Sequence, residues 1–252
     1  MRFLSISILG LAFLFSACST VKKYSAEDTV SESKKVNHFF AKEFAKGLER
    51  SPMMYTYMGQ KKRYGELNDI SHEFFLEGHE LTKASLKEMR KFKYDALDEK
   101  TKLSYRLYKE KLESQIKGFK YMYHGYYVNQ MHGLQSMIPT FLINMHRIDS
   151  ESDAKAYIQR VKAVNKMFSD LLIGLKAQEE KGVKYPNFVF AKVISDSKNI
   201  ISGFPFEGKG KAPLYADFKT KLRKLKKLSP VKKKILTREL EIALSTKLGP
   251  AY

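Results

Sequence analysis

Apolar side chains recur every three or four residues along most of this chain, a period that gives an α-helix one buried face. One segment illustrates the pattern with Val36, Phe39, Phe40, Phe44 and Leu48. The sequence shows no convincing two-residue alternation of the strand type and no internal repeat. We therefore predict an all-α fold, in which one irregular multi-helix domain covers residues 36–252.

Capping residues and prolines divide this pattern into separate helices. Ser71 and Asp98 each precede a periodic segment and can accept hydrogen bonds from its first amide groups. In the segment after Asp98, the spacing predicts an inward face made of Leu103, Leu107, Leu112 and Phe119. Pro139 is expected to divide an uncharged stretch, and the Gly-Pro pair at 249–250 is expected to end the last helix.

The first eighteen residues have the three-part layout of a bacterial export signal. Arg2 is followed by an apolar run over 3–15, which is too short for a stable membrane span. A Ser-Ala pair then precedes Cys18, the one cysteine of the chain, in an order that resembles the lipobox of bacterial lipoproteins. The resemblance implies a lipoprotein signal peptide over 1–17, acylation of Cys18 and a flexible tether over 18–35. The alternative is an ordinary signal peptide with an incidental cysteine.

The lipobox interpretation also sets the expected compartment. Acylation of Cys18 would make membrane lipid a partner and would place the protein in the cell envelope. Ser19, rather than Asp, follows the cysteine. In lipoproteins of this type, that choice favours the outer membrane, with the domain facing the periplasm.

The chain is strongly basic, with a formal net charge of +19, and such an excess attracts anionic surfaces. Anionic lipid and glycolipid are the candidate partners, and nucleic acid is not expected outside the cytoplasm. The alternative is a merely solvated basic face. The densest basic run consists of Lys219, Lys221, Arg223, Lys224, Lys226, Lys227, Lys232, Lys233 and Lys234.

Residues 121–148 form an aromatic, amide-rich stretch with almost no charge, so they should be buried or line a cleft. Amides in such a stretch can contact a ligand, or they can satisfy buried backbone groups. The histidines of this stretch are open to the same two interpretations. The candidate cleft-lining residues are Asn129, Gln130, His132, Gln135 and His146.

The block Asn-Gln-Met-His-Gly-Leu-Gln at 129–135 resembles the bacterial family called domain of unknown function 885. Further matching segments lie at 51–71, 103–113, 138–148, 153–158 and 182–194, and the chain closes on Gly-Pro-Ala-Tyr at 249–252. The resemblance implies a mainly helical, zincin-like fold related to gluzincin metallopeptidases. It also implies that zinc belongs to the C-terminal half of the full-length family, on a His-Glu-x-x-His helix.

No His-Glu-x-x-His motif occurs in these 252 residues. His72 and His79 are seven residues apart, or roughly 10 Å along a helix, so they cannot share one zinc ion. We therefore assign no catalytic residue, no metal ligand and no cofactor to this chain. It is expected to correspond to the family's N-terminal half, through truncation, a split gene or a degenerate copy, with a separate C-terminal half as a candidate partner.

Two functional hypotheses follow from these observations. The first is a membrane-anchored lipoprotein of a metallopeptidase-like family that forms one wall of a substrate cleft and lacks the catalytic zinc motif. The alternative is a non-enzymatic lipoprotein that binds an anionic envelope partner through its basic face.

Overall fold

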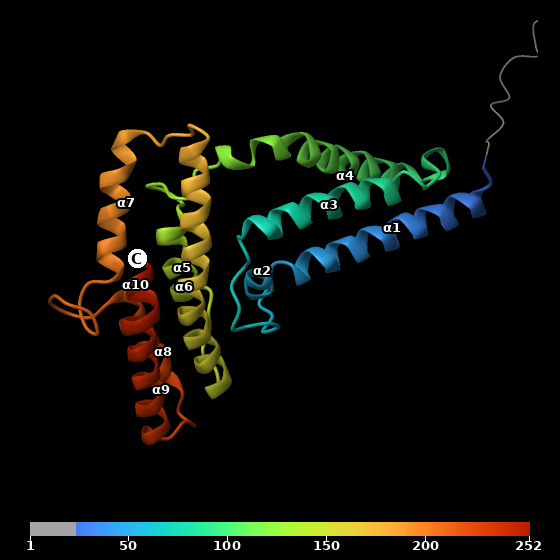
Figure 1. Ribbon diagram of the computed structural model, residues 1–252. Coiled ribbons are helices and arrows are strands. Elements are labelled where there is room, and N and C mark those ends of the chain that lie inside the picture. Colours follow the sequence, from blue (N-terminus) through green and yellow to red (C-terminus); the bar gives the residue numbers. More distant parts are fainter. Residues whose placement is uncertain (1–23) are drawn as a thin grey trace, which may run out of the picture.

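The computed structural model describes residues 24–252, and this part of the chain is all-α, as predicted (Figure 1). Between Phe204 and Lys211 lies an isolated β-bridge. No helix within the described range is both long and apolar enough to cross a bilayer. The elements are α1 (Ala26–Glu49), α2 (Pro52–Tyr57), α3 (His72–Met89), η1 (Tyr94–Ala96), α4 (Glu99–Gly118), η2 (Phe119–His124), α5 (Leu134–Asn144), α6 (Glu151–Glu180), α7 (Asn187–Ile200), α8 (Pro213–Lys224), α9 (Pro230–Ala243), the π-helical turn η3 (Leu244–Leu248) and α10 (Gly249–Ala251).

The first helix begins ten residues earlier than the sequence predicts, which corrects residues 26–35 of the proposed flexible tether. The Ser25 hydroxyl accepts a hydrogen bond from the Asp28 amide, and the Asp28 carboxylate accepts one from the Ser25 amide. This reciprocal capping box fixes the start of α1. Farther along, Glu32 and Ser33 are buried. Their side chains accept hydrogen bonds from the backbone amides of Lys93 and Asp98, which lie between α3 and α4. Residues 26–35 therefore belong to the folded domain.

Helices α1, α3 and α4 pack together as a small lobe, which extends to the right of Figure 1. Caps form at the predicted positions, because Ser71 accepts a hydrogen bond from Phe74 and Asp98 accepts one from Thr101. The small lobe has its own hydrophobic core, which is made of Val36, Leu86, Met89, Leu97, Tyr105 and Leu112.

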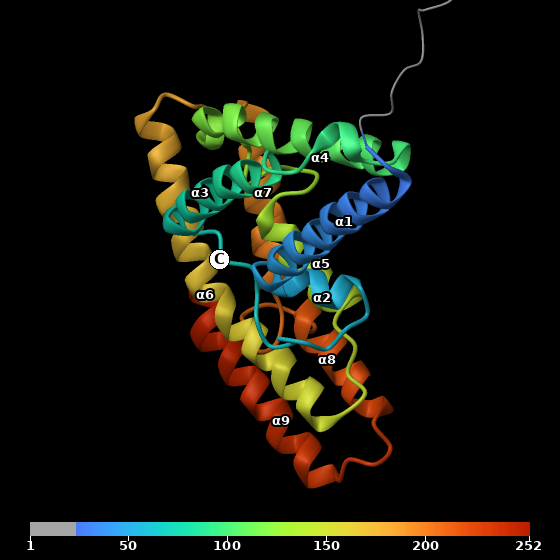
Figure 2. The same ribbon diagram turned by 90° about the vertical axis from the view of Figure 1, so that its right-hand side faces the viewer.

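Helices α5, α6, α8 and α9 surround a separate and larger core, the large lobe. Helix α6 has 30 residues and runs alongside α9 in both views (Figures 1 and 2). One face of α6 supplies most of its buried positions, including Tyr157, Val161, Val164 and Phe168. The long helix therefore acts as the spine of this lobe.

The predicted inner face of α4 is correct at one end of the helix and wrong at the other. Leu112 is buried as predicted, but Leu103 and Leu107 are 50% and 64% exposed, and Tyr105 is buried in their place. Leu103 and Tyr105 both have helical spacing to later apolar residues, so periodicity alone does not choose between them. The face with Tyr105 turns inward because its ring packs against Tyr94 while its hydroxyl donates to the Met89 carbonyl.

Pro139 lies inside α5 and does not divide the segment, contrary to the prediction. A proline has no amide hydrogen, so the carbonyl four residues earlier loses its usual helical donor. That carbonyl belongs to Gln135, and the Tyr252 hydroxyl donates to it at 2.7 Å. Burial raises the pKa of Tyr252, which keeps its phenol protonated and able to donate. The C-terminal residue thus repairs the gap that the proline creates.

Replacing Tyr252 by phenylalanine should lower the free energy of unfolding by about 1–3 kcal/mol, the usual cost of a buried acceptor left without its donor. The ring can keep its packing against Phe168, 4.7 Å away between centroids, so the change isolates the hydroxyl. Urea unfolding followed by circular dichroism measures the effect. Tyr121→Phe, at a 54% exposed tyrosine, is the matched control. Equal stabilities of the two variants would contradict the repair.

The last helix also continues past its predicted stop, because α9, η3 and α10 follow one another without a break as far as Ala251. The wider π-helical turn directly precedes the Gly-Pro pair at 249–250. A Cβ atom at Gly249 would lie 2.9 Å from the Phe206 ring, so glycine permits close packing here. The unbroken helix up to Ala251 brings Tyr252 to α5, where its hydroxyl reaches the Gln135 carbonyl.

Candidate functional site

A cavity of about 490 Å³ lies where the two lobes meet. Its walls come from the start of α3, from η2 and the chain up to α5, and from the C-terminal half of α6. The lining is mainly aromatic and aliphatic, with few polar groups, which is the usual character of a ligand site. The lining residues are Ile70, His72, Glu73, Phe75, Met122, Tyr123, Tyr126, Tyr127, His132, Leu134, Asp170, Leu171, Ile173, Gly174 and Ala177.

Gln178 holds the aromatic wall in place. This side chain is 1% exposed, and its amide nitrogen donates to the Tyr123 carbonyl at 2.7 Å and to the Gly125 carbonyl at 2.5 Å. Its amide oxygen accepts from the Tyr185 hydroxyl, which in turn accepts from the Tyr127 amide. An irregular segment needs such partners for its backbone groups. The shape of the cavity therefore depends on a glutamine that the sequence patterns did not single out.

Two of the cavity's polar groups come from the first turn of α3, and Asp170 and His132 line it from α6 and from the chain before α5. His72 bonds through Nδ1 to the Tyr123 hydroxyl at 3.1 Å, and Glu73 lines the same hollow. His79 lies elsewhere, with its ring stacked on Phe119 at 3.9 Å between centroids. Within residues 24–252, no three His, Cys, Asp or Glu side chains are close enough to hold a metal ion.

The five predicted cleft-lining residues have different positions, and His132 is the one that lines this cavity. Asn129 shapes the preceding turn, because its side-chain oxygen accepts from the amides of Met131 and His132. Gln130 lies at the surface. Gln135 is buried and donates to the Asn129 carbonyl at 2.6 Å. The structure thus gives Asn129 and Gln135 the backbone-satisfying role that the sequence left open.

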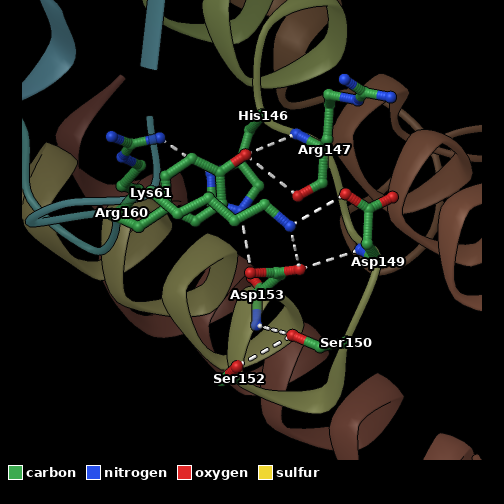
Figure 3. A network of polar contacts seen from close by, with 9 residues as sticks. Lys61, His146, Arg147, Asp149, Ser150, Ser152, Asp153 and Arg160 are labelled. Carbon is green, nitrogen blue, oxygen red and sulfur yellow. Dashed lines mark hydrogen bonds and ion pairs between the residues drawn. The ribbon is translucent and has the colours of Figure 1, made fainter. Parts of the chain in front are cut away.

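His146, the fifth of these residues, lies in the large lobe beside a buried cation, away from the cavity (Figure 3). Arg160 of α6 is completely buried and donates to His146 Nδ1 at 2.9 Å, to the Thr56 hydroxyl at 2.7 Å and to the Glu66 carbonyl at 2.9 Å. The rings of Tyr64 and Phe141 each lie 4.9 Å from the guanidinium carbon. Arg160 therefore ties α2, the loop before α3 and α5 to the spine helix.

The hydrogen bonds of His146 define its protonation. Nδ1 accepts from Arg160, so Nε2 carries the hydrogen and donates to the Asp153 carbonyl at 3.0 Å. Desolvation, together with the nearby positive charges, lowers the pKa of His146 to about 3. Burial also lowers the pKa of Arg160, to about 10, which leaves the guanidinium charged at neutral pH. The histidine is thus a neutral acceptor for a buried cation, and the arrangement is structural.

An ion-paired layer covers this core at the start of α6 (Figure 3). Lys61 contacts Asp149 at 2.8 Å and Asp153 at 2.6 Å. The N-cap of α6 is Ser150, whose hydroxyl accepts from the Asp153 amide. These contacts fix the loop between α5 and α6.

The basic run at 219–234 is not uniformly solvated, because Lys221 turns inward. Its ammonium group donates to the carbonyls of Leu142 and Ile143, at 2.9 and 2.7 Å, and pairs with Asp217 at 2.8 Å. Lys221 thus caps the carbonyl end of α5. The predicted lipidation site, Cys18, and the predicted signal peptide lie outside the described residues.

Comparison with known proteins places this architecture in a family. The model of the family described as "Bacterial protein of unknown function (DUF885)" matches residues 52–252. The chain belongs to this family. The DUF885 segment includes the cavity, the buried Arg160 and the basic helices, whereas α1 precedes it. No curated protein matches the chain.

A solved structure has the same fold as this DUF885 chain. It is the crystal structure of "the putative lipoprotein from Colwellia psychrerythraea", and the TM-score is 0.74 with 17% sequence identity. The similarity covers 88% of this chain and 40% of that chain. The chain therefore spans less than half the length of the structure it matches.

Proposed function

We propose that this protein is a lipid-anchored component of the cell envelope whose interlobe cavity binds an apolar or aromatic side chain of a polypeptide. The cavity carries this proposal, because its volume of about 490 Å³ and its aromatic lining suit such a group. Six of the lining residues come from 121–148, the segment in which the sequence predicts a cleft wall. In this function the chain forms one wall of a substrate cleft.

Two observations support the envelope location. The sequence carries a signal-like N-terminus that ends at Cys18, and a protein of the same fold is described as a lipoprotein. If Cys18 is acylated, the seven residues between it and Ala26 can span at most about 28 Å, even when fully extended. The small lobe would then lie close to the membrane.

Catalytic groups are not part of this proposal. A catalytic zinc needs three protein ligands and an open position, and these 252 residues contain no His-Glu-x-x-His motif. We propose instead that the chain holds a substrate, while any metallopeptidase chemistry would come from a separate C-terminal half of the kind the family resemblance implies.

A cavity-filling variant tests the proposal. Gly174 lies on the cavity wall within α6, and a Cβ atom there would make ordinary contact with Tyr127 at 3.8 Å. Gly174→Leu should therefore fill the hollow, while the helix gains about 0.5–1 kcal/mol from the loss of glycine. Binding is measured with the neutral fluorescent probe N-phenyl-1-naphthylamine, and a blocked phenylalanine amide serves as competitor. We expect the affinity to fall about tenfold or more, which corresponds to a loss of about 1.4 kcal/mol or more.

Gly118→Leu is the matched control, because it places the same side chain at an exposed helical glycine with nothing within 4 Å of the new Cβ atom. This variant should bind the probe as the wild type does. Binding that survives Gly174→Leu, or that falls equally in both variants, would place the probe outside the cavity and refute the proposed role.

A further inference from the structure

A second hollow, of about 390 Å³, lies between α8 and α9 on the large lobe, and we call it the α8–α9 groove. Four cations from three segments line it. Lys219 and Arg223 are one turn apart on α8, Lys233 faces them from α9, and Lys211 comes from the loop before α8. The remaining lining residues are Ala216, Thr220, Leu222 and Thr237.

The backbone around the groove is fixed. The Lys211 loop is closed by hydrogen bonds from Phe204 to the Gly210 carbonyl and from Ala212 to the Phe204 carbonyl. Across the groove, the Lys233 ammonium group donates to the Arg223 carbonyl at 3.4 Å. Leu222 is 2% exposed, so the floor of the groove is the edge of the hydrophobic core. The cations are therefore attached to rigid elements.

The groove is unusual because its lining contains no carboxylate. The neighbouring hollow at the start of α9 mixes both signs, since Lys224, Lys226 and Lys227 share it with Asp149 and Glu151. Elsewhere in the basic run, Lys232 pairs with Glu151 at 2.7 Å. In the part of the chain that the structure describes, no ion pair joins Lys211, Lys219, Arg223 or Lys233 to an acidic side chain.

Like charges held together lower stability, and cations at i and i+4 on a helix repel each other. A bound anion would relieve this repulsion. Guanidinium and ammonium groups together match the oxygens of a phosphate group, and the Thr220 hydroxyl at the groove can supply a further donor. A phosphomonoester carries between one and two negative charges near neutral pH, more than a phosphodiester.

We propose that the α8–α9 groove binds a phosphate group that can carry two negative charges. The group belongs either to free inorganic phosphate or to a lipid or glycolipid headgroup that ends in a phosphomonoester. This site is separate from the interlobe cavity and does not depend on the function proposed there. It assigns a specific chemistry to part of a basic surface that net charge alone leaves unspecified.

Phosphorus-31 NMR titration of the full-length protein in neutral detergent at low salt tests the proposal. The probes are inorganic phosphate, a short-chain phosphatidic acid with a monoester headgroup, and a short-chain phosphatidylglycerol with a diester headgroup. We expect saturable binding of inorganic phosphate and phosphatidic acid, and weaker binding of phosphatidylglycerol. The bound phosphate should also ionise at lower pH, because the cations stabilise its dianion.

The test variant is Lys219→Gln with Arg223→Gln, which should weaken phosphate binding about tenfold or more through the loss of two charge-assisted contacts. The matched control is Lys100→Gln with Lys117→Gln, which removes two exposed cations from α4, at the other end of the molecule in Figure 1. The control should change the dissociation constant by less than about twofold, since exposed distant charges are screened.

The outcomes separate the sources and can overturn the site. Equal binding of inorganic phosphate and phosphatidic acid supports recognition of the phosphate group itself. Tighter binding of phosphatidic acid supports a lipid headgroup as the source. An equal effect of the test and control variants would mean that net charge alone attracts the probe. That result, or the absence of saturation, would overturn the proposal.

Discussion

Arg160→Ala is expected to lower the free energy of unfolding by about 3–5 kcal/mol, a large share of the roughly 5–15 kcal/mol by which native domains are stable. The substitution leaves two buried acceptors, on His146 and Thr56, and the partly buried Glu66 carbonyl without this donor. It also opens a void between the rings of Tyr64 and Phe141. The lost hydrogen bonds and the void both lower the stability of the folded state.

Lys162→Ala is the matched control for this experiment. It lies on the exposed face of the same helix, two residues farther on, and should change stability by less than about 0.5 kcal/mol. Urea unfolding monitored by circular dichroism compares the two variants. A cost for Arg160→Ala no larger than that of the control would show that the guanidinium is not a structural tie.

Cys18→Ser is expected to abolish lipid attachment entirely, because the serine hydroxyl cannot replace the thiol as the acyl acceptor. This expectation rests on the Ser-Ala pair that directly precedes Cys18, the one cysteine of the chain. Metabolic labelling with a fatty-acid analogue, followed by membrane fractionation, measures the loss. Ser19→Ala, one residue away, should keep its label. Equal labelling of Cys18→Ser and wild type would refute the lipoprotein interpretation.

Local sequence signals predicted most of the helices and many of their ends. Ser71 and Asp98 both accept the first-turn hydrogen bonds expected of N-caps, because a cap depends on neighbouring residues alone. The failures involve distant partners. Pro139 continues a helix because Tyr252 satisfies the freed carbonyl, and the inner face of α4 is set by Tyr94 and Met89. No local pattern contains that information.

The candidate site, like the fold, was predictable from the sequence only in part. The uncharged aromatic stretch at 121–148 indicated that its residues would be buried or line a cleft, and six of them, His132 included, line the cavity. The cavity's other walls come from α3 and α6, whose contribution depends on how the two lobes pack. Gln178 and Arg160 looked like ordinary polar residues on a long amphipathic helix. Their importance comes from burial, which periodicity does not reveal for a single polar position.

The two lobes have separate cores, and this division has a mechanical consequence. If the chain is anchored at Cys18, any pull between the membrane and the large lobe passes first through α1 and the small core of six residues. Because α3 belongs to that lobe and forms one wall of the cavity, tension on the anchor would deform the cavity before it disturbed the large core. Force applied to the N-terminus of the purified protein should therefore release ligand at a lower load than it takes to unfold α6 and α9.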